Sequence, residues 1–149
     1  MTTELNANWT LSFRHWENGA MTTIPAAVPG NVESDLAAAQ LIGDYWPPDR
    51  VFPLAALETA EWVYRCEFAA PERPSAPDRI KLVFDGIDTV AEIRLNGTLI
   101  LCCDNMFIAH EADVTDVLRD GVNQLEVRIL PAAVYARRFG LPVTFMGFH

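Results

Sequence analysis

Hydrophobic and polar residues alternate with a period of two in five stretches of the chain. In WTLSFRHW, residues 9–16, the side chains of Trp9, Leu11 and Phe13 fall on one face and polar ones on the other. The same alternation recurs in WVYRCEF (62–68), IKLVF (80–84), AEIRL (91–95) and QLEVRI (124–129). Each stretch predicts a strand with one buried and one solvent-facing side. Such strands are typical of an antiparallel sandwich rather than of a parallel sheet buried on both faces.

A helix is predicted in PGNVESDLAAAQLIGD, residues 29–44. Asn31 has the short polar side chain that commonly caps a helix N-terminus. Apolar residues follow it at helical spacing, and Gly43 is the expected stop at the C-terminus.

A second, shorter helix is predicted in VTDVLRDG, residues 114–121. Thr115 is its expected N-cap and Gly121 its stop, which leaves about two turns between them. Residues 25–61 are rich in proline and alternate little. A segment of that length in a compact domain tends to be functional or to cover something. Residues 70–78 are expected to form a polar surface loop.

The length and composition suit a single domain over residues 1–149. Half of the residues are hydrophobic, which is enough for a packed core without disulfides or metal. The net charge of −9 argues against nucleic acid or an anionic membrane as a partner. The N-terminus, MTTELNANW, has no signal-peptide pattern, and no apolar run reaches membrane-spanning length. We therefore expect a cytoplasmic protein.

The cysteines and histidines do not form a metal-binding pattern. There are three of each, and no two cysteines have the CxxC spacing of zinc sites. We interpret Cys66, Cys102 and Cys103 as free thiols of a reducing compartment. Because Cys102 and Cys103 are adjacent in a strand-like run, they are expected to point to opposite faces. No metal or other cofactor is predicted.

Four segments together resemble a known protein family. In chain order they are PGNVESDLAAAQLIGD, EWVYRCEF, LVFDGIDTVAEIRLNGTLI and DNMFIAHEADVTDVLRDGVNQLEVRI. This combination is similar to the N-terminal sugar-binding domain of glycoside hydrolase family 2, and most closely to its β-mannosidase branch. The likeness extends from about Trp9 to Leu130. It implies an all-β fold, a jelly-roll β-sandwich of the galactose-binding domain-like type with one or two short helices.

The resemblance assigns structural roles to two loops. It implies that LNG, residues 95–97, is a hairpin turn in which Asn96 and Gly97 supply positive φ angles. We interpret both as scaffold. Residues 105–107, Asn-Met-Phe, are interpreted as turn and packing residues. In the family they lie near the edge that meets the catalytic barrel, so a role at that interface stays open.

The catalytic machinery of the family is not expected in this chain. Retaining glycosidases use two carboxylates roughly 5 Å apart. In family 2 these lie on a (β/α)8 barrel, and such a barrel needs about 250 residues. Glu58 and Glu61 are close in sequence, but their position before a strand favours solvated turn residues over a catalytic pair. We expect no hydrolase activity from the chain alone.

The resemblance implies that residues 43–62, GDYWPPDRVFPLAALETAEW, border the sugar pocket of the intact enzyme. Asp44 and Trp46 match the family's acidic and aromatic positions, while its usual Asn-Glu pair is replaced by Arg50 and Val51. We predict that Asp44, Trp46 and Arg50 bind carbohydrate. An aromatic ring accommodates the apolar side of a pyranose, and a few polar groups orient it.

Two alternatives concern the aromatic residues and the tail. Trp46 and Phe52 are also suited to anchoring the loop against the sandwich, and Trp16 is a weaker sugar-binding candidate. The Gly-Trp-Asp-Trp-Gly-Pro motif that usually follows the last strand is not found in residues 131–149. The altered loop and the missing motif favour a changed substrate or a divergent homologue. The tail is apolar and is expected to lead to, or pack on, another domain, and an exposed apolar patch would promote self-association.

Three functions are open at this stage. The chain is an accessory domain that packs on a catalytic barrel, in the same polypeptide or a partner chain, and borders its sugar pocket. Alternatively it is a free carbohydrate-binding module, or an interaction sandwich without sugar affinity. The apolar tail and the missing motif favour the first. An enzyme in its own right is not expected, since no nucleophile elbow, paired metal motif or phosphate loop is found.

Overall fold

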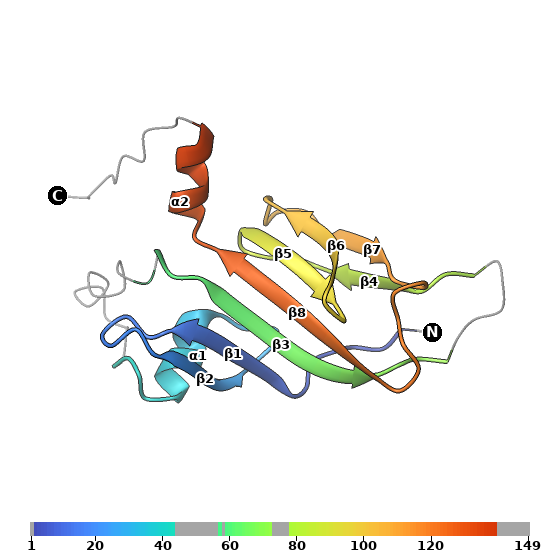
Figure 1. The fold of residues 1–149 in the computed structure, drawn as a ribbon, viewed down its shortest axis with the longest axis horizontal. Coiled ribbons are helices and arrows are strands. Elements are labelled where there is room, and N and C mark those ends of the chain that lie inside the picture. Colours follow the sequence, from blue (N-terminus) through green and yellow to red (C-terminus); the bar gives the residue numbers. More distant parts are fainter. Residues whose placement is uncertain (1, 44–56, 58, 73–77, 140–149) are drawn as a thin grey trace.

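The computed structural model in Figure 1 describes residues 2–43, 57, 59–72 and 78–139. Within these residues the chain forms eight strands, two short α-helices and one 3-10 turn. The strands are β1 (Trp9–Arg14), β2 (Met21–Ala26), β3 (Trp62–Ala69), β4 (Lys81–Phe84), β5 (Val90–Leu95), β6 (Thr98–Cys103), β7 (His110–Asp113) and β8 (Val122–Leu130). The helical elements are α1 (Val32–Ala38), α2 (Ala132–Ala136) and η3 (Arg137–Phe139).

The strands form two antiparallel sheets. The larger has six strands in the order β2-β1-β3-β8-β5-β6, and the smaller pairs β4 with β7. The α1 helix lies behind β1 and β2 in Figure 1. Side chains from α1 and from β4 join the same apolar cluster as the inward residues of the large sheet. One face of the six-stranded sheet is therefore covered and the other is open, as the prediction of an all-β sandwich requires.

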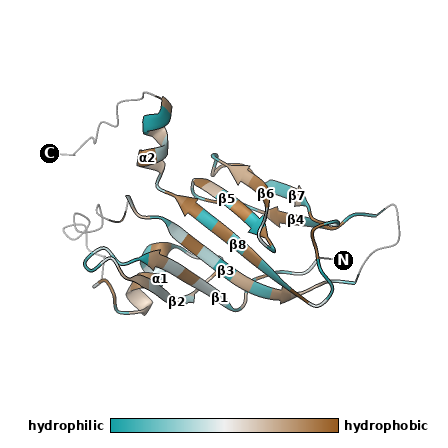
Figure 2. Ribbon diagram, in the orientation of Figure 1, coloured by the Kyte–Doolittle hydropathy of each residue, from teal (hydrophilic) through white to brown (hydrophobic). Residues whose placement is uncertain are grey.

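The predicted alternation matches the observed burial. On β1 the predicted inward residues Trp9, Leu11 and Phe13 are buried, and on β5 Ile93 and Leu95 are fully buried. The same pattern appears in Figure 2 as alternating brown and teal bands along β3, β5 and β8. Because inward side chains of neighbouring strands stack over the same face, a period of two along the chain becomes a continuous core.

The first predicted helix exists, but it ends earlier than expected. Asn31 is its N-cap, as predicted, and its Oδ1 accepts a hydrogen bond from Ser34 N at 2.8 Å. The helix stops at Ala38, not near Gly43, because Gln40 adopts a φ of +59°. Leu41 N donates to Leu36 O at 2.9 Å, which closes the six-to-one bond of a Schellman motif.

The second predicted helix, residues 114–121, is wrong. The segment forms a turn in which the Thr115 side chain donates to Asp113 Oδ1 at 2.7 Å. Further along, the Asn123 side chain accepts from Arg119 N and donates to Arg119 O, each at 2.9 Å. These are the backbone groups that a helix would use, so the side chain competes with helix formation.

The hairpin between β5 and β6 confirms the predicted role of Asn96 and Gly97. Their φ angles are +53° and +85°, which is the left-handed pair of a two-residue type I′ turn. Asn96 also acts through its side chain, whose Nδ2 donates to Val117 O at 3.1 Å. The turn residue therefore ties the hairpin to the loop before β8.

Asn123 completes this connection from inside the core. Its side chain is 0% exposed and uses all of its hydrogen-bonding capacity. Oδ1 accepts from Asn96 Nδ2 at 2.8 Å and from Arg119 N at 2.9 Å, and Nδ2 donates to the carbonyl oxygens of Arg119 and Gly121 at 2.9 and 3.3 Å. A buried amide is stable only when it is satisfied in this way.

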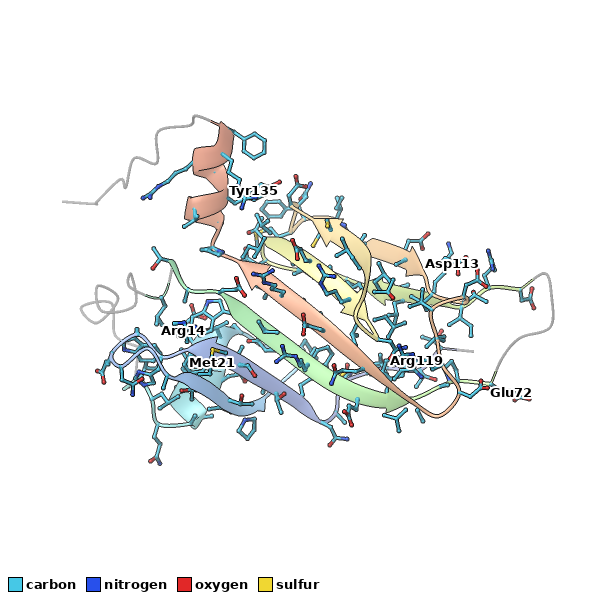
Figure 3. All side chains as sticks on the ribbon, in the orientation of Figure 1. Arg14, Met21, Glu72, Asp113, Arg119 and Tyr135 are labelled. Atoms are coloured by element: carbon cyan, nitrogen blue, oxygen red, sulfur yellow. The ribbon has the colours of Figure 1, made fainter. Side chains whose placement is uncertain are left out.

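The register places five chain segments at one end of the six-stranded sheet, which we call the α2 end. There β1 ends at Arg14, β6 at Cys103 and β8 at Leu130, while β3 begins at Trp62 and β5 at Val90. The loops that follow or precede these residues must therefore cluster. We call the opposite end, with the β5–β6 hairpin, the far end; Figure 3 labels Tyr135 at the first and Glu72 at the second.

Candidate functional site

The three residues predicted to bind carbohydrate, Asp44, Trp46 and Arg50, lie outside the residues that the structure describes. The same holds for Phe52 and for the tail beyond residue 139. Their roles therefore stay predictions. What the structure does describe is the surface from which this loop departs, because β3 begins at the α2 end.

An aromatic stack lies where the β1–β2 hairpin leaves the α2 end. The ring of Trp16 stacks on His15 with centroids 4.5 Å apart and on Phe13 at 6.0 Å. Phe13 in turn contacts Trp62, the first residue of β3, at 5.2 Å. Trp16 is half-buried and packs against the core. Only the exposed part of the Trp16 ring is therefore available for the predicted contact with a sugar.

Glu61 is held by an ion pair and is not the freely solvated turn residue that the sequence suggested. Its two carboxylate oxygens each accept a hydrogen bond from Arg128, both at 2.7 Å. Arg128 also approaches Glu92 at 3.5 Å, and the hydrogen bond to Glu61 raises the pKa of the guanidinium. The pair is half-exposed, so its contribution to stability is small, but its fork geometry orients the residues entering β3.

A buried polar contact joins α1 to the large sheet. Asp35 is 4% exposed, and its Oδ1 accepts from Ala27 N at 2.9 Å while its Oδ2 accepts from Tyr64 Oη at 3.0 Å. Burial, together with the neighbouring Asp35 carboxylate, raises the pKa of the Tyr64 hydroxyl. The hydroxyl therefore remains a donor, and α1 is fixed beneath β3.

The β6–β7 loop presents an apolar surface at the α2 end. Asn105 Oδ1 accepts from Phe107 N at 2.9 Å, which confirms the predicted turn. The predicted packing role is wrong within this chain, because the Phe107 side chain is 87% exposed, and its neighbours Met106 and Ile108 are also exposed. An aromatic ring that a turn holds outward exposes apolar surface to water, which is unfavourable unless another surface covers it.

The α2–η3 segment, at the same end of the sheet, also exposes apolar residues. Figure 1 shows α2 standing away from both sheets after β8. Val134 and Phe139 are exposed, and the Phe139 ring makes an edge contact with Tyr135 at 5.3 Å. Arg138 lies over the Tyr135 ring at 5.7 Å. The segment is thus ordered by its own contacts, while its apolar residues remain uncovered. We call Met106, Phe107, Ile108, Val134 and Phe139 the apolar end surface.

Comparison with known proteins identifies the family. Residues 9–140 match the family described as glycosyl hydrolase 2 galactose-binding domain-like. The chain belongs to this family. The match covers all of the strands and both helices described above, which agrees with the resemblance found in the sequence.

Relatives of this glycosyl hydrolase 2 domain are longer proteins. β-Mannosidase of Rattus norvegicus is 37% identical over 132 residues, which are 89% of this chain and 14% of the relative. β-Mannosidase B of Thermothelomyces thermophilus is 38% identical over 124 residues, 83% of this chain and again 14% of the relative. The chain therefore spans about a seventh of the length of these curated relatives.

Solved structures show the same fold. The crystal structure of β-D-mannosidase from Dictyoglomus thermophilum is similar with a TM-score of 0.76 and 34% identity, covering 96% of this chain and 17% of that one. A β-glucuronidase from Ruminococcus gnavus is similar with a TM-score of 0.61 and 25% identity, covering 87% of this chain and 22% of that one. The galactose-binding domain-like sandwich is thereby confirmed.

Two further observations concern the described part of this glycosyl hydrolase 2 domain. It contains no group of three or more His, Cys, Asp or Glu residues placed to hold a metal ion. None of the helices in the described residues is long and apolar enough to cross a membrane.

Sequence reasoning missed the Glu61–Arg128 pair and the helical structure of the α2–η3 segment. The two charged residues are 67 positions apart, so no local pattern connects them. The α2–η3 segment did carry a signal, since Pro131 is followed by residues with helix-forming preference. We interpreted these residues only as part of an apolar tail and predicted no helix there.

Proposed function

We propose that this chain is the accessory domain of a β-mannosidase-like glycoside hydrolase. In this role it packs through its α2 end on a catalytic (β/α)8 barrel, and residues 44–50 border the sugar pocket. The observation that carries the proposal is the apolar end surface, whose Phe107 is held outward by a turn. Exposed apolar clusters of this kind mark protein interfaces.

The share of the relatives that the chain covers supports the same role. The matched region is about a seventh of the two curated mannosidases named above, so most of each relative lies outside it. A (β/α)8 barrel of about 250 residues fits in that remainder but not in this chain. Cleavage by two carboxylates then belongs to the barrel, and this domain contributes position and a pocket wall.

Two sets of contacts at the α2 end hold the segments beside the proposed pocket loop in place. The bidentate Glu61–Arg128 pair and the Trp16 stack orient the two segments next to the proposed pocket loop. A wall that contacts a substrate must be held within a fraction of an ångström, which requires rigid supports of this type. Asp44, Trp46 and Arg50 remain the proposed carbohydrate contacts.

The test begins with the reading frame downstream of His149. We expect it to continue into a catalytic domain, and the longer protein to hydrolyse p-nitrophenyl β-mannoside while this chain alone does not. In the longer protein, Phe107→Asp should loosen the domain and increase proteolysis at its junction. Leu99→Asp is the matched control, because Leu99 is an exposed apolar residue on the edge strand β6 beside the far-end hairpin. A frame that stops at His149, with no partner gene encoding a barrel, would favour a free carbohydrate-binding module instead.

A further inference from the structure

A groove of mixed polar and apolar lining lies on the open face of the six-stranded sheet at its far end. It is a hollow of about 600 Å³, lined by Asn8, Thr10, Arg65, Cys66, Glu67, Phe68, Ala69, Val122 and Gln124. This volume falls within the range of about 300–1,000 Å³ typical of small-molecule sites. The groove lies at the opposite end of the sheet from the apolar end surface, so it takes no part in the docking proposed above.

The groove exists because β3 extends further toward the far end than its pairing with β1 does. The two strands pair only from Ser12–Val63 to Thr10–Arg65. At Asn8 the backbone has a φ of +60°, and the preceding residues turn toward the core, where Leu5 packs and accepts a hydrogen bond from Trp9 Nε1 at 2.6 Å. Residues 66–69 therefore have β8 on one side and, among the described residues, no strand on the other.

This missing strand leaves peptide groups facing the groove. Ala70 N donates to Gly121 O at 2.7 Å, so the even-numbered residues of β3 direct their backbone groups toward β8. In an antiparallel ladder the direction alternates along the strand. The N–H and C=O groups of Glu67 and Ala69 consequently point into the groove, where they are available as donors and acceptors.

The side chains around these peptide groups supply a mixed set of polar atoms without a free positive charge. Arg65 is already bound to Glu126, at 2.8 Å, and approaches Ser12 Oγ at 3.4 Å. Glu67 and Gln124 face each other across β3 and β8, and both are exposed. A carboxylate, an amide and open peptide groups are complementary to hydroxyl groups, which both donate and accept.

An apolar strip completes the groove. Ala69 and Val122 are directly opposite each other on β3 and β8, and Val122 is 66% exposed. The strip lies beside Glu67 and Gln124 on the same open face. Apolar C–H surface next to hydroxyl-binding groups matches a pyranose ring, which has an apolar side and a polar rim.

We propose that this groove is a second carbohydrate site that binds neutral hexopyranose units. The apolar side of the sugar lies over Ala69 and Val122, and its hydroxyls bind Glu67, Gln124 and the free peptide groups. Acidic sugars are excluded because the Glu67 carboxylate is unpaired among the described residues and the chain carries a net charge of −9. The site holds a polysaccharide at a distance from the proposed catalytic pocket.

The test is an amide NMR titration of the full 149-residue chain with β-1,4-mannotriose, cellotriose and β-1,4-galactotriose, and with glucuronate as the acidic probe. We expect saturable shifts at the amides of Glu67, Ala69 and Gln124 with at least one neutral sugar and none with glucuronate. Glu67→Ala and Gln124→Ala should each weaken binding about ten-fold, since each removes a hydrogen-bonding group. Circular dichroism melts check that both variants fold.

Matched controls separate this groove from the predicted loop site. Glu17→Ala removes an exposed carboxylate in the β1–β2 turn at the α2 end, and Trp46→Ala removes the predicted aromatic contact. Neither should change the shifts at Glu67. The proposal is overturned if no neutral sugar shifts these amides, or if Trp46→Ala abolishes the shifts. It is also overturned if only an extended peptide such as acetyl-TVTVTV-amide shifts them, because the open edge would then bind a strand.

Discussion

Replacing Asn123 by alanine should destabilise the domain more than replacing any exposed asparagine. The buried side chain makes four hydrogen bonds, to Asn96, to Gly121 and twice to Arg119. At about 0.5–1.5 kcal/mol for each neutral bond, their loss amounts to about 2–6 kcal/mol. The backbone groups of Arg119 are near solvent and recover part of this by binding water. We therefore expect a decrease of about 3 kcal/mol in the free energy of unfolding.

Urea unfolding followed by far-ultraviolet circular dichroism measures this effect. With an m-value of about 2 kcal/mol/M, the midpoint should fall by about 1.5 M. Asn105→Ala is the matched control, because it removes one exposed hydrogen bond to Phe107 N and should cost under about 1 kcal/mol. If Asn123→Ala loses no more than Asn105→Ala, the buried amide does not hold the β5–β6 hairpin and the loop before β8 together, and the reasoning fails.

The thiols, the end of α1 and the exposed loop each provide a shorter test. Ellman's reagent should label Cys102 rapidly in the native chain and the two buried thiols only after unfolding; three equally fast thiols would contradict the burial. Burial raises the pKa of Cys66 from 9.0 to about 11, so the folded state holds its proton more tightly than the unfolded state. The contribution of the Cys66 thiol to the free energy of unfolding should therefore be fully present below pH 9 and fall by about 1.4 kcal/mol per pH unit up to about pH 11. In urea titrations, Cys66→Ala should reduce this slope. Gln40→Gly should stabilise the domain by about 1 kcal/mol in thermal melts, because glycine adopts a φ of +59° without strain; a loss of stability would contradict the Schellman assignment. Phe107→Ser should reduce self-association in analytical ultracentrifugation and leave the melting temperature unchanged, whereas a large fall in melting temperature would show that the ring packs internally.

The sequence was most informative where a strand has one buried face. The five predicted strands all exist, because inward positions such as Leu11 and Ile93 must be apolar and their neighbours need not be. Two strands, β2 and β7, were missed for the opposite reason. β2 buries only Ile24, and β7 is four residues long. The strand-like run predicted at Cys102 and Cys103 is confirmed as β6. Cys102 and Cys103 do point to opposite faces, one exposed and one buried, as their adjacency in β6 predicts.

The candidate sites depend on contacts that no local pattern contains. The far-end groove requires that β1 pair with β3 no further than Thr10 while β3 continues to Ala69, and this is a property of the register. The outward position of Phe107 could not be inferred either, because an apolar residue in a turn is usually assumed to pack. By contrast, Asn31 and the Asn96–Gly97 turn were predictable, since the chemistry of caps and tight turns is local.

The position of β8 has a consequence for how the protein is made. Among the described residues β8 is the last strand along the chain, yet it lies between β3 and β5 and joins the two halves of the large sheet. Until the ribosome has released Leu130, the nascent chain holds β2-β1-β3 and β5-β6 as separate pieces, each with an open edge. Open edges pair readily with other chains, so this interval is when the domain is most prone to aggregate. The addition of β8 is therefore the step that pairs the open edges of β3 and β5 and lowers the tendency of the domain to aggregate.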